Sequence, residues 1–317
     1  MSDYSFFIKK IYKYKFFINI LKFIKKKFDK IVIFFPDRIY LKYIYLSKTG
    51  KILNLDNPKL FSEKINYLKI KNKHSEKIKL YADKFLLRDQ LKKLYLDKYL
   101  TKLYLCKNIA DFTIDDLKLI QRKHKSFFVK LSNDSGSSLR VTDQTNFKEI
   151  YMSIKKSYEN KKNFIRKTRE YQYLTETKVM FEEDLINKNL KLYDMKLFCF
   201  NGQMKLIQIG TNKTGTCYFD ENFKILDLYL QASLIGEIDY YSGKKINPVE
   251  KDTMNNIKND ILKFTKDFSF IRVDFITDLR LNFYLNEITF SPSSGFKIYQ
   301  SDTLKNFDKK LGNYIQI

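Results

Sequence analysis

The sequence has no tryptophan, two histidines, three cysteines and four prolines among its 317 residues. With only His74 and His124 available, a histidine-rich zinc site is excluded and a Ser-His-Asp hydrolase is poorly supported. The cysteines, Cys106, Cys199 and Cys217, lack the spacing of metal ligands, and their odd number argues against a disulfide framework. We therefore expect a protein of a reducing compartment, the cytoplasm.

Long apolar runs are also missing. No stretch has the length of uninterrupted apolar sequence that a transmembrane helix requires, and the start of the chain lacks a signal-peptide cleavage site. Hydrophobic residues nevertheless make up 44% of the sequence and aromatic residues 16%, which argues against a disordered chain. A chain of this length can bury a substantial core and has room for two or three lobes.

The formal net charge of +24 suggests an anionic partner: nucleic acid, a membrane surface or an acidic glycan. The abundance of Lys, Ile, Asn, Tyr and Phe also fits an AT-rich genome, so local clusters of charge are more informative than the total. Proteins that bind single-stranded nucleic acid interleave stacking aromatics with basic residues. Here most aromatics occupy core-facing periodic positions, and no recognisable nucleic-acid module occurs. Nucleic-acid binding is therefore an alternative function only. Under the leading interpretation no nucleic-acid partner is expected.

Residues 1–35 predict a basic amphipathic helix. Its apolar positions recur at helical spacing: Phe7, Ile11, Tyr14, Ile18 and Leu21. Residues 1–30 contain nine lysines and two aspartates, a net charge of +7. Such a helix either anchors the protein to an anionic membrane surface or docks on the body of the protein, and the sequence favours neither.

Two carboxylates, Asp274 and Glu287, lie in the stretch from Ile271 to Phe296, each in a run of alternating polar and apolar residues. Residues 277–280 between the runs are typical of a hairpin turn, so both side chains are expected on neighbouring positions of one face. Paired carboxylates on rigid strands repel each other unless a cation lies between them, and hard oxygen ligands suit Mg²⁺. Arg272 shares that face and has the charge to meet a phosphoryl group. For an isolated pair, solvated residues on a half-exposed hairpin are the alternative.

The rest of this stretch resembles the metal-binding hairpin of the ATP-grasp superfamily. Its end, E-x-T-F-x-P-x-S-G-F, is similar to that of the TupA-like ATP-grasp family, whose members are associated with bacterial cell-surface polysaccharide synthesis. The resemblance implies that Asp274 and Glu287 bind the magnesium ions that bridge the nucleotide phosphates. It also implies that Arg272 neutralises the transferring phosphoryl group as a catalytic residue. Thr289 stands where many ATP-grasp enzymes have an asparagine as a further metal ligand.

Two upstream segments resemble the phosphate-binding elements of these enzymes. A-D-K-F-L-L-R lies in a predicted helix, and the resemblance places its last basic residue, Arg88, on the nucleotide phosphates. S-F-F-V-K-L predicts a strand, and the small-residue loop after it allows backbone N–H groups to approach an anion. The resemblance implies that Lys130 binds the phosphates and that Ser135, Gly136 and Ser137 fold over them.

Residues 178–185, K-V-M-F-E-E-D-L, resemble the hinge between the lobes, where Glu182 or Glu183 faces the base or the ribose. D-M-K-L-F-C-F-N-G, farther along, closely resembles the corresponding TupA-like strand. Asp194 and Lys196 of this strand share a face by alternation, which suits a ribose contact and a phosphate contact. Lys196 is therefore both a nucleotide-binding and a catalytic candidate. The Asn-Gly pair that ends the segment predicts a tight hairpin turn.

These motifs imply an α+β protein with the ATP-grasp fold, in which two α+β lobes sandwich ATP behind an N-terminal helical region. The expected division is a basic amphipathic segment (1–50), a helical pre-ATP-grasp region (51–125), a small lobe with the phosphate loop (126–185) and a large lobe with the metal-binding hairpin (186–317). Within the second region, Asn57-Pro58 predicts the start of a helix.

The resemblance implies an ATP-dependent carboxylate–amine ligase that forms an amide through an acyl phosphate, with ATP and Mg²⁺ as cofactors. The carboxylate would be a uronic acid, or an amino acid linked to a sugar, in a capsule or cell-surface glycan. A kinase that phosphorylates a small molecule or a sugar is the second hypothesis, because no residue identifies the acceptor. We expect a cytoplasmic enzyme, either free or held peripherally at the inner face of the membrane by residues 1–35.

Overall fold

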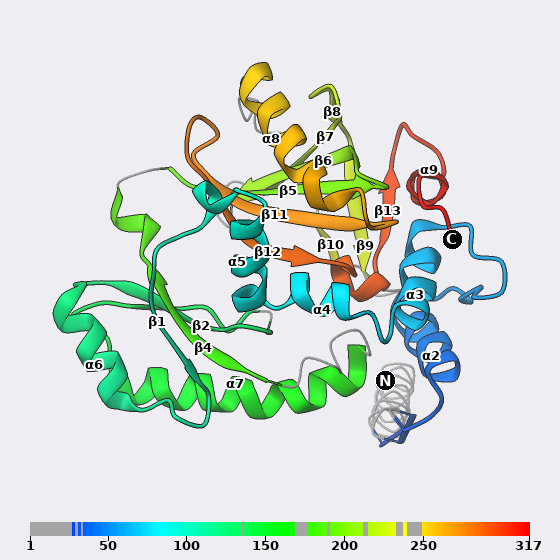
Figure 1. The fold of residues 1–317 in the computed structure, drawn as a ribbon. Coiled ribbons are helices and arrows are strands. Elements are labelled where there is room, and N and C mark those ends of the chain that lie inside the picture. The colour runs from blue at the N-terminus through cyan, green and yellow to red at the C-terminus, as the bar shows by residue number, and fades with distance from the viewer. Residues whose placement is uncertain are drawn as a thin grey trace, which may run out of the picture.

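The computed structural model describes residues 27–28, 31–32, 34–134, 136–168, 176–188, 191–211, 215–232, 237–239 and 249–317. The predicted helix over residues 1–35 therefore lies almost wholly outside the described residues. The described strands form three antiparallel sheets of four, six and three strands. Figure 1 shows the four-stranded sheet below the six-stranded sheet, with helices along their outer sides. The expected α+β class is confirmed.

Several helices precede the first sheet. They are α2 (Asp37–Thr49), α3 (Phe61–Lys71), α4 (Glu76–Ala82), α5 (Lys84–Lys93) and the 3₁₀ turn η1 (Asp97–Tyr99). The expected helix start at Pro58 is wrong, because α3 begins only at Phe61. The carboxylate of Glu63 accepts the backbone N–H groups of Lys59 and Leu60 at 2.9 and 3.0 Å, which satisfies the exposed donors of a helix that starts there.

The four-stranded sheet, with the order β1-β4-β2-β3, forms the small lobe. Its elements are β1 (Leu103–Asn108), α6 (Ile114–Lys123), β2 (Phe127–Leu131), β3 (Leu139–Val141), α7 (Phe147–Thr168) and β4 (Lys178–Glu183). Leu117 of α6, Ile154 of α7 and Val129 of β2 share one buried core. Both β1 and α6 precede residue 126, so this lobe begins earlier than the expected division placed it.

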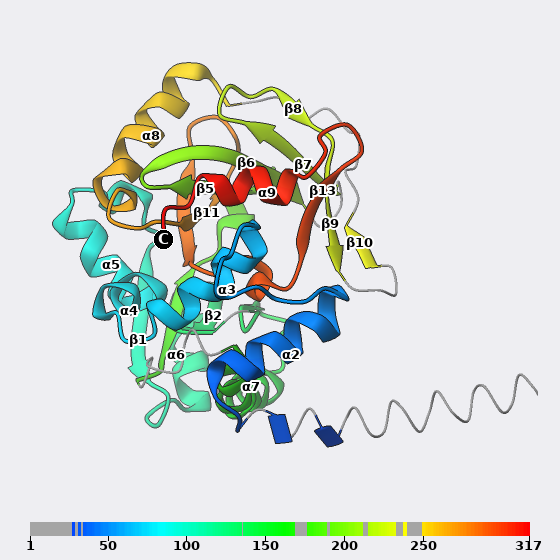
Figure 2. The ribbon, with the colours of Figure 1, turned by 90° about the vertical axis from the view of Figure 1, so that its right-hand side faces the viewer.

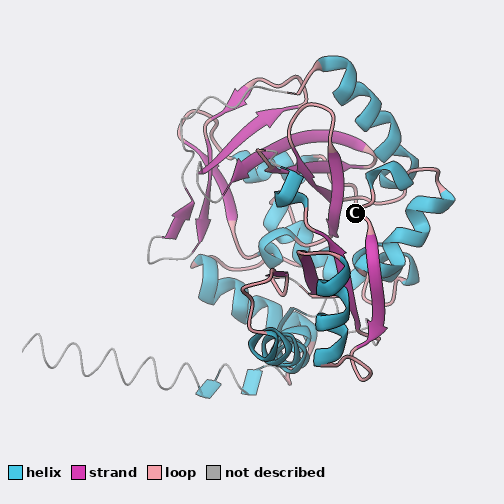
Figure 3. Ribbon diagram, turned by 90° about the vertical axis from the view of Figure 1, so that its left-hand side faces the viewer, coloured by secondary structure: helices cyan, strands magenta, loops and turns pink. Residues whose placement is uncertain are grey.

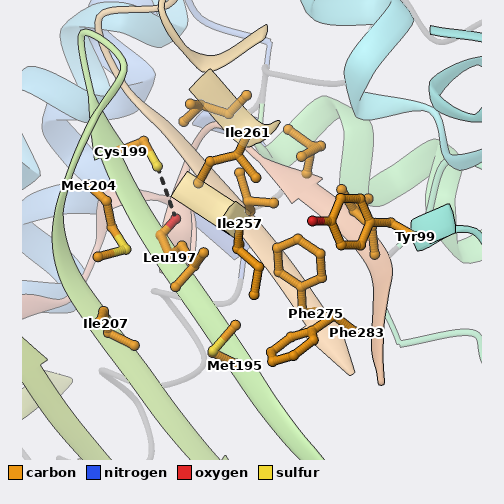
Figure 4. Close-up of a cluster of buried hydrophobic side chains, with 14 of the residues drawn as sticks. Tyr99, Met195, Leu197, Cys199, Met204, Ile207, Ile257, Ile261, Phe275 and Phe283 are labelled. Atoms are coloured by element: carbon orange, nitrogen blue, oxygen red, sulfur yellow. Dashed lines mark hydrogen bonds between the residues drawn. The ribbon is translucent and has the colours of Figure 1, made fainter. Parts of the chain in front are cut away.

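The six-stranded sheet, with the order β12-β11-β5-β6-β7-β8, forms the large lobe. Its strands are β5 (Tyr193–Phe200), β6 (Gln203–Thr211), β7 (Gly215–Asp220), β8 (Ile225–Leu226), β11 (Ile271–Thr277) and β12 (Phe283–Thr289). One face of this sheet is apolar and packs on α8 (Lys251–Thr265); Figure 4 shows Ile257 and Ile261 of α8 beside Leu197 of β5. Asn201 and Gly202 join β5 to β6 with φ angles of 49° and 81°, which confirms the predicted hairpin turn.

A third sheet and the C-terminal helix cover part of the other face of the six-stranded sheet (Figure 2). Their elements are β9 (Leu228–Ala232), β10 (Glu237–Asp239), η3 (Pro292–Gly295), β13 (Ile298–Ser301) and α9 (Phe307–Asn313). Phe61 of α3, Phe198 of β5 and Tyr299 of β13 meet there in a buried aromatic core. Seen from the opposite side, helices lie along the right-hand and lower parts of the molecule, and strands form its upper-left edge (Figure 3). Among the described helices, none has the length and apolar character to cross a membrane.

Candidate active site

A cavity of about 500 Å³ lies between the small-lobe sheet and strands β5, β11 and β12. Its apolar walls are formed by Phe128, Leu131, Leu185, Ile186, Leu192, Tyr193, Ile276, Tyr284 and Leu285. Its polar lining consists of Lys84, Thr101, Lys130, Asp134, Gly136, Ser137, Ser138, Glu182, Glu183, Asp194, Asn286 and Glu287. The volume is in the range of cofactor sites, and apolar walls joined to a lysine-bearing end suit a base and its phosphates.

The two predicted metal-binding carboxylates lie side by side. Asp274 of β11 pairs with Glu287 of β12, and on its other side it pairs with Lys196 of β5. These three residues, which we call the active-site row, therefore share the face that looks toward the small lobe. The β11–β12 register shifts directly after Asp274, which leaves Asn286 without a partner on β11. Asn286 joins Glu287 in lining the cavity.

Arg272 binds Asp274 through a bidentate ion pair. Its Nε donates to Oδ1 at 2.7 Å and its Nη2 to Oδ2 at 2.6 Å. Burial opposes the charge on the guanidinium, but the ion pair outweighs burial and raises the pKa of Arg272. Nη2 also donates to Thr289 Oγ1 at 3.1 Å and lies 3.8 Å from Glu287 Oε1. Thr289, the expected third metal ligand, thus supports Arg272 and is not among the residues that line the cavity.

Lys84, the first residue of α5, connects the small-lobe loop to the active-site row. Its Nζ donates to the backbone oxygen of Asp134 at 2.6 Å and lies 3.5 Å from Glu287 Oε2. Asp83 fixes its position, since it caps α5 and accepts the Ser132 hydroxyl at 2.7 Å. Burial raises the pKa of Glu287, but Lys84 and two further cations outweigh burial and lower it. Glu287 is therefore ionised at neutral pH.

Lys130 and Arg88 share one buried counter-charge. Lys130 Nζ lies 2.6 Å from Glu182 Oε2, and Arg88 Nη1 lies 3.2 Å from Glu182 Oε1. Arg88 also donates to the backbone oxygen of Thr101 at 2.5 Å, and burial lowers its pKa. Lys130 reaches the cavity and approaches Asn286 Oδ1 at 3.3 Å, whereas Arg88 lies behind Glu182 and is absent from the cavity lining. The expected contact of Arg88 with nucleotide phosphates stays a prediction, and in this structure its guanidinium is bound by Glu182 and Thr101.

The loop after β2 partly faces the cavity. Gly136 has a φ of 88°, a conformation that favours glycine, and Ser137 accepts the backbone N–H of Leu131 at 3.1 Å. Both residues line the cavity, and a Cβ added at Gly136 would meet nothing within 4 Å. Ser135, the third residue expected here, lies outside the described residues. The described residues of the loop thus line the same cavity as Lys84 and Lys130.

The hinge acids differ in their partners. Both Glu182 and Glu183 line the cavity, but the carboxylate oxygens of Glu182 are bound by Lys130 and Arg88. Glu183 lies 3.2 Å from Lys188 Nζ at the edge of the cavity. Asp194, the expected ribose contact, is exposed and lines the same cavity. Of the two hinge acids, Glu183 is the one with an oxygen left for a ligand.

Sequence reasoning missed two residues of this site, Lys84 and Asn286. The sequence did contain an indication for Lys84. In A-D-K-F-L-L-R it directly follows Asp83, a residue type that caps helices, so Lys84 is expected at the first position of the helix. Asn286 had none, because strict alternation along β12 assigns it to the face opposite Glu287. Only the bulge brings both to the cavity.

The donor atoms present fit magnesium. Within the described ranges, no group of three or more His, Cys, Asp and Glu side chains is arranged to hold a metal ion. Asp274 and Glu287 supply two adjacent carboxylates, and Asn286 supplies an amide oxygen beside them. Hard oxygen donors in this small number match the way proteins hold Mg²⁺ together with substrate phosphates.

Comparison with known families decides the classification. Residues 63–316 match the family described as "TupA-like ATPgrasp". The chain belongs to the TupA-like ATP-grasp family. ATP and Mg²⁺, which ATP-grasp ligases use, are therefore its cofactors, and the expected family and fold are confirmed. No curated protein matches the chain.

Solved structures similar to the chain include other ATP-grasp proteins. D-alanine–D-alanine ligase from Helicobacter pylori is 16% identical with a TM-score of 0.43, over 75% of this chain and 62% of that one. N5-carboxyaminoimidazole synthetase from Staphylococcus aureus is 13% identical with a TM-score of 0.36, over 66% of this chain and 44% of that one. The ATP-grasp ligase PsnB, solved with a precursor peptide and AMPPNP, is 9% identical with a TM-score of 0.38, over 80% and 64%. The chain thus spans less than two thirds of the length of these proteins.

Proposed function

We propose that this protein is an ATP-dependent carboxylate–amine ligase that forms an amide through an acyl phosphate. The observation that carries the proposal is the active-site row, in which Glu287 lines a nucleotide-sized cavity together with Lys84 and Lys130, and Asp274 and Lys196 follow Glu287 on the neighbouring strands. The chemistry of such ligases consists largely of positioning and charge stabilisation. A site built from carboxylates and ammonium groups, as this one is, suits that chemistry.

The nucleotide would lie with its base between the apolar walls and its phosphates toward Lys84 and Lys130. The backbone at Gly136 and Ser137 would cover the phosphates, because these residues line the same end of the cavity. Glu182 would hold Lys130 in place rather than contact the base, since it already binds that ammonium at 2.6 Å.

The remaining hinge and strand acids would contact the sugar. Glu183 and Asp194 both line the cavity, and each carries carboxylate oxygens that accept hydrogen bonds from ribose hydroxyls, whereas Glu182 is bound by Lys130 and Arg88. Arg88 would bind Glu182 on the side away from the cavity and balance the negative charge of that carboxylate.

Asp274, Glu287 and the amide oxygen of Asn286 would hold the magnesium ions. When bound, magnesium neutralises the phosphates and orients them for displacement. Arg272 orients Asp274 through its two hydrogen bonds and opposes the rise that burial causes in the pKa of Asp274, and Thr289 holds Arg272 in that position. Lys196, adjacent to Asp274, adds positive charge where negative charge accumulates during transfer.

Two displacement steps complete the reaction. A carboxylate oxygen of the acceptor attacks the γ-phosphorus of ATP, a new P–O bond forms, and the bond to the ADP oxygen breaks. The nitrogen of an amine then attacks the acyl carbon, the C–N bond forms, and the C–O bond breaks with release of phosphate. The amine proton passes to water. Arg272 and Lys196 would stabilise the charge on the transferred group in the first step.

The acceptor would be a uronic acid, or an amino acid linked to a sugar, in a capsule or cell-surface glycan. Family membership supports this context, and the chain's charge of +24 supports an anionic substrate. A kinase is the second candidate, because the same site transfers a phosphoryl group and only the acceptor differs.

A screen of uronic acids and nucleotide-sugar uronates against a panel of amines tests the proposal. A ligase releases ADP and free phosphate in equal amounts, and only when carboxylate and amine are both present. ADP formed without free phosphate would identify the kinase. Oligonucleotide binding that falls steeply with salt, without any nucleotide turnover, would favour the nucleic-acid alternative.

We further propose that the protein associates peripherally with anionic membrane on the cytoplasmic side, where ATP is available. The support is a set of exposed apolar side chains in residues 28–52, which overlap the end of the basic segment 1–30 in the sequence: Phe28, Ile31, Phe34, Phe35, Ile39, Leu46 and Ile52. Five of them, Phe28, Phe35, Ile39, Leu46 and Ile52, line one open pocket, and Ile52 is 83% exposed. Apolar burial and charge together give stable binding to an anionic bilayer.

A further inference from the structure

Ser132, the first residue of the loop after β2, is completely buried and uses every polar group that it has. Its backbone N–H donates to the backbone oxygen of Lys178 at 2.9 Å, and its backbone oxygen accepts the N–H of Lys84 at 2.7 Å. Its hydroxyl donates to Asp83 Oδ2 at 2.7 Å and accepts the N–H of Lys178 at 3.2 Å. These bonds fasten the beginning of the loop to the start of α5 and to the start of β4.

The loop meets α5 a second time, farther along. The backbone N–H of Lys84 binds Ser132, and the ammonium of the same lysine donates to the backbone oxygen of Asp134 at 2.6 Å. At the other end of the loop, Ser137 Oγ accepts the N–H of Leu131 at 3.1 Å, which ties the loop back to β2. Hydrogen bonds therefore set the position of the loop backbone relative to the Lys84 ammonium.

Ser132 and Asp83 act on the nucleotide cavity without reaching it. Lys84, Asp134 and Gly136 line the cavity, whereas Ser132 and Asp83 are not among the lining residues. An effect of the Ser132 hydroxyl on a bound nucleotide must therefore pass through Lys84 and the loop backbone.

The carboxylate of Asp83 does more than cap a helix. Its Oδ1 accepts the N–H groups of Phe85 and Leu86 at 2.8 and 3.1 Å, and these two bonds make the cap of α5. Its Oδ2 takes no part in the cap and accepts the hydroxyl of Ser132. The two functions of Asp83 thus rest on different oxygens, so a substitution can separate them.

We infer that Ser132 is a positioning residue of the nucleotide site. Through its bond to Asp83, its hydroxyl holds the loop backbone and the Lys84 ammonium in one arrangement, so that both contact the phosphates together. The inference rests on the proposed placement of the nucleotide, with its phosphates at this end of the cavity. Misplacement of binding groups by about 1 Å can cost roughly 100-fold in rate, so a hydroxyl that touches no ligand can have a large effect.

The test compares AMP-PNP, bound in the presence of Mg²⁺, with adenosine, which has no phosphates. Ser132→Ala removes the hydroxyl and leaves the cap of α5 complete. Asp83→Asn keeps an oxygen for the cap and replaces the acceptor of the Ser132 hydroxyl by a donor. By calorimetric titration we expect about tenfold weaker AMP-PNP binding to each variant. The dissociation constant of adenosine, measured by competition with AMP-PNP, should stay at the wild-type value.

Ser62→Ala is the matched control. Ser62 of α3 is also completely buried, its hydroxyl donates to the buried carboxylate of Asp308 at 2.8 Å, and it does not line the cavity. This variant loses the same kind of bond and should bind AMP-PNP like the wild type. The double variant Asp83→Asn, Ser132→Ala should lose no more AMP-PNP affinity than Ser132→Ala alone, because both changes remove one interaction.

Other results overturn the inference. AMP-PNP affinity of Ser132→Ala equal to that of Ser62→Ala would show that the hydroxyl only stabilises the fold. Equal losses of adenosine and AMP-PNP affinity would indicate a distorted cavity, and additive losses in the double variant would refute the link through Asp83. If Ser132→Ala does not fold, Asp83→Asn decides by the same comparison. Failure of the wild type to bind AMP-PNP would contradict the proposed function itself, so the two failures are distinguishable.

Discussion

Replacing Lys130 should weaken ATP binding and spare the fold, whereas replacing Glu182 should destabilise the fold, although the two side chains form one ion pair. In Lys130→Met, the remaining carboxylate of Glu182 stays paired with Arg88 at 3.2 Å, so no buried charge is left alone. The fold should therefore survive. ATP binding should weaken instead, because a charge-assisted hydrogen bond to phosphate contributes about 1.5–3 kcal/mol. Its loss corresponds to a roughly 10- to 150-fold increase in the dissociation constant of ATP.

Glu182→Gln should instead destabilise the protein. It leaves the ammonium of Lys130 and the guanidinium of Arg88 beside each other without their shared counter-charge, and their side chains are only 8% and 11% exposed. Removal of one member of such a buried pair typically costs about 3–5 kcal/mol. ATP phosphates would restore part of this charge balance, so bound ATP should raise the stability of Glu182→Gln more than that of the wild type.

Calorimetric ATP titration and urea unfolding, each with and without ATP, measure both effects. Lys107→Met is the matched control, since Lys107 lies in the same small lobe, pairs with Asp116 at 2.9 Å and does not line the cavity. ATP binding of Lys130→Met equal to that of Lys107→Met would show that Lys130 is only a structural partner of Glu182. Wild-type stability of Glu182→Gln would refute the buried triad.

Three further predictions follow from the same structure. Asp274→Asn and Glu287→Gln should each abolish turnover and leave the far-ultraviolet circular dichroism spectrum unchanged, and normal activity of either variant with magnesium would remove that residue from the metal site. Burial raises the pKa of Asp308 to about 6, above its unfolded value, so its stabilising contribution is full below about pH 4 and is lost as pH rises through 6. The unfolding free energy of wild type relative to Asp308→Asn should therefore fall by about 3 kcal/mol across that window, and a constant difference would refute the shift. Deletion of residues 1–35 should release the protein from anionic vesicles and spare ATP turnover with a soluble substrate, whereas a lower melting temperature with no vesicle preference in the intact protein would indicate a helix docked on the enzyme.

Local patterns in the sequence predicted the parts of the fold that depend on near neighbours. Asn201-Gly202 specifies its turn because both positions adopt positive φ angles, and the alternation in β11 and β12 placed Asp274 opposite Glu287. The family motifs predicted the ATP-grasp fold. In each case the information lies within a few residues of the feature.

Features that depend on distant contacts were missed. Strand β1 pairs Leu103 with Glu182, so nothing near Leu103 in the sequence shows that it belongs to the small-lobe sheet. Arg88 and Lys84 lie one helical turn apart, and only the distant ion pair of Arg88 with Glu182 of β4 shows which of them reaches the cavity. The bulge at Asn286 is likewise a property of the strand pair, because alternation along a single strand does not reveal a shifted register.

Transfer of oxygen from the carboxylate to phosphate tests the central claim most directly. The protein would be supplied with ATP, Mg²⁺, an amine and a uronic acid labelled with ¹⁸O in its carboxylate, and the released phosphate would be analysed by mass spectrometry. Formation of an acyl phosphate that an amine then cleaves predicts one ¹⁸O atom in each phosphate released and none in ADP. Unlabelled phosphate, or label retained on a phosphorylated sugar without free phosphate, would contradict the ligase mechanism.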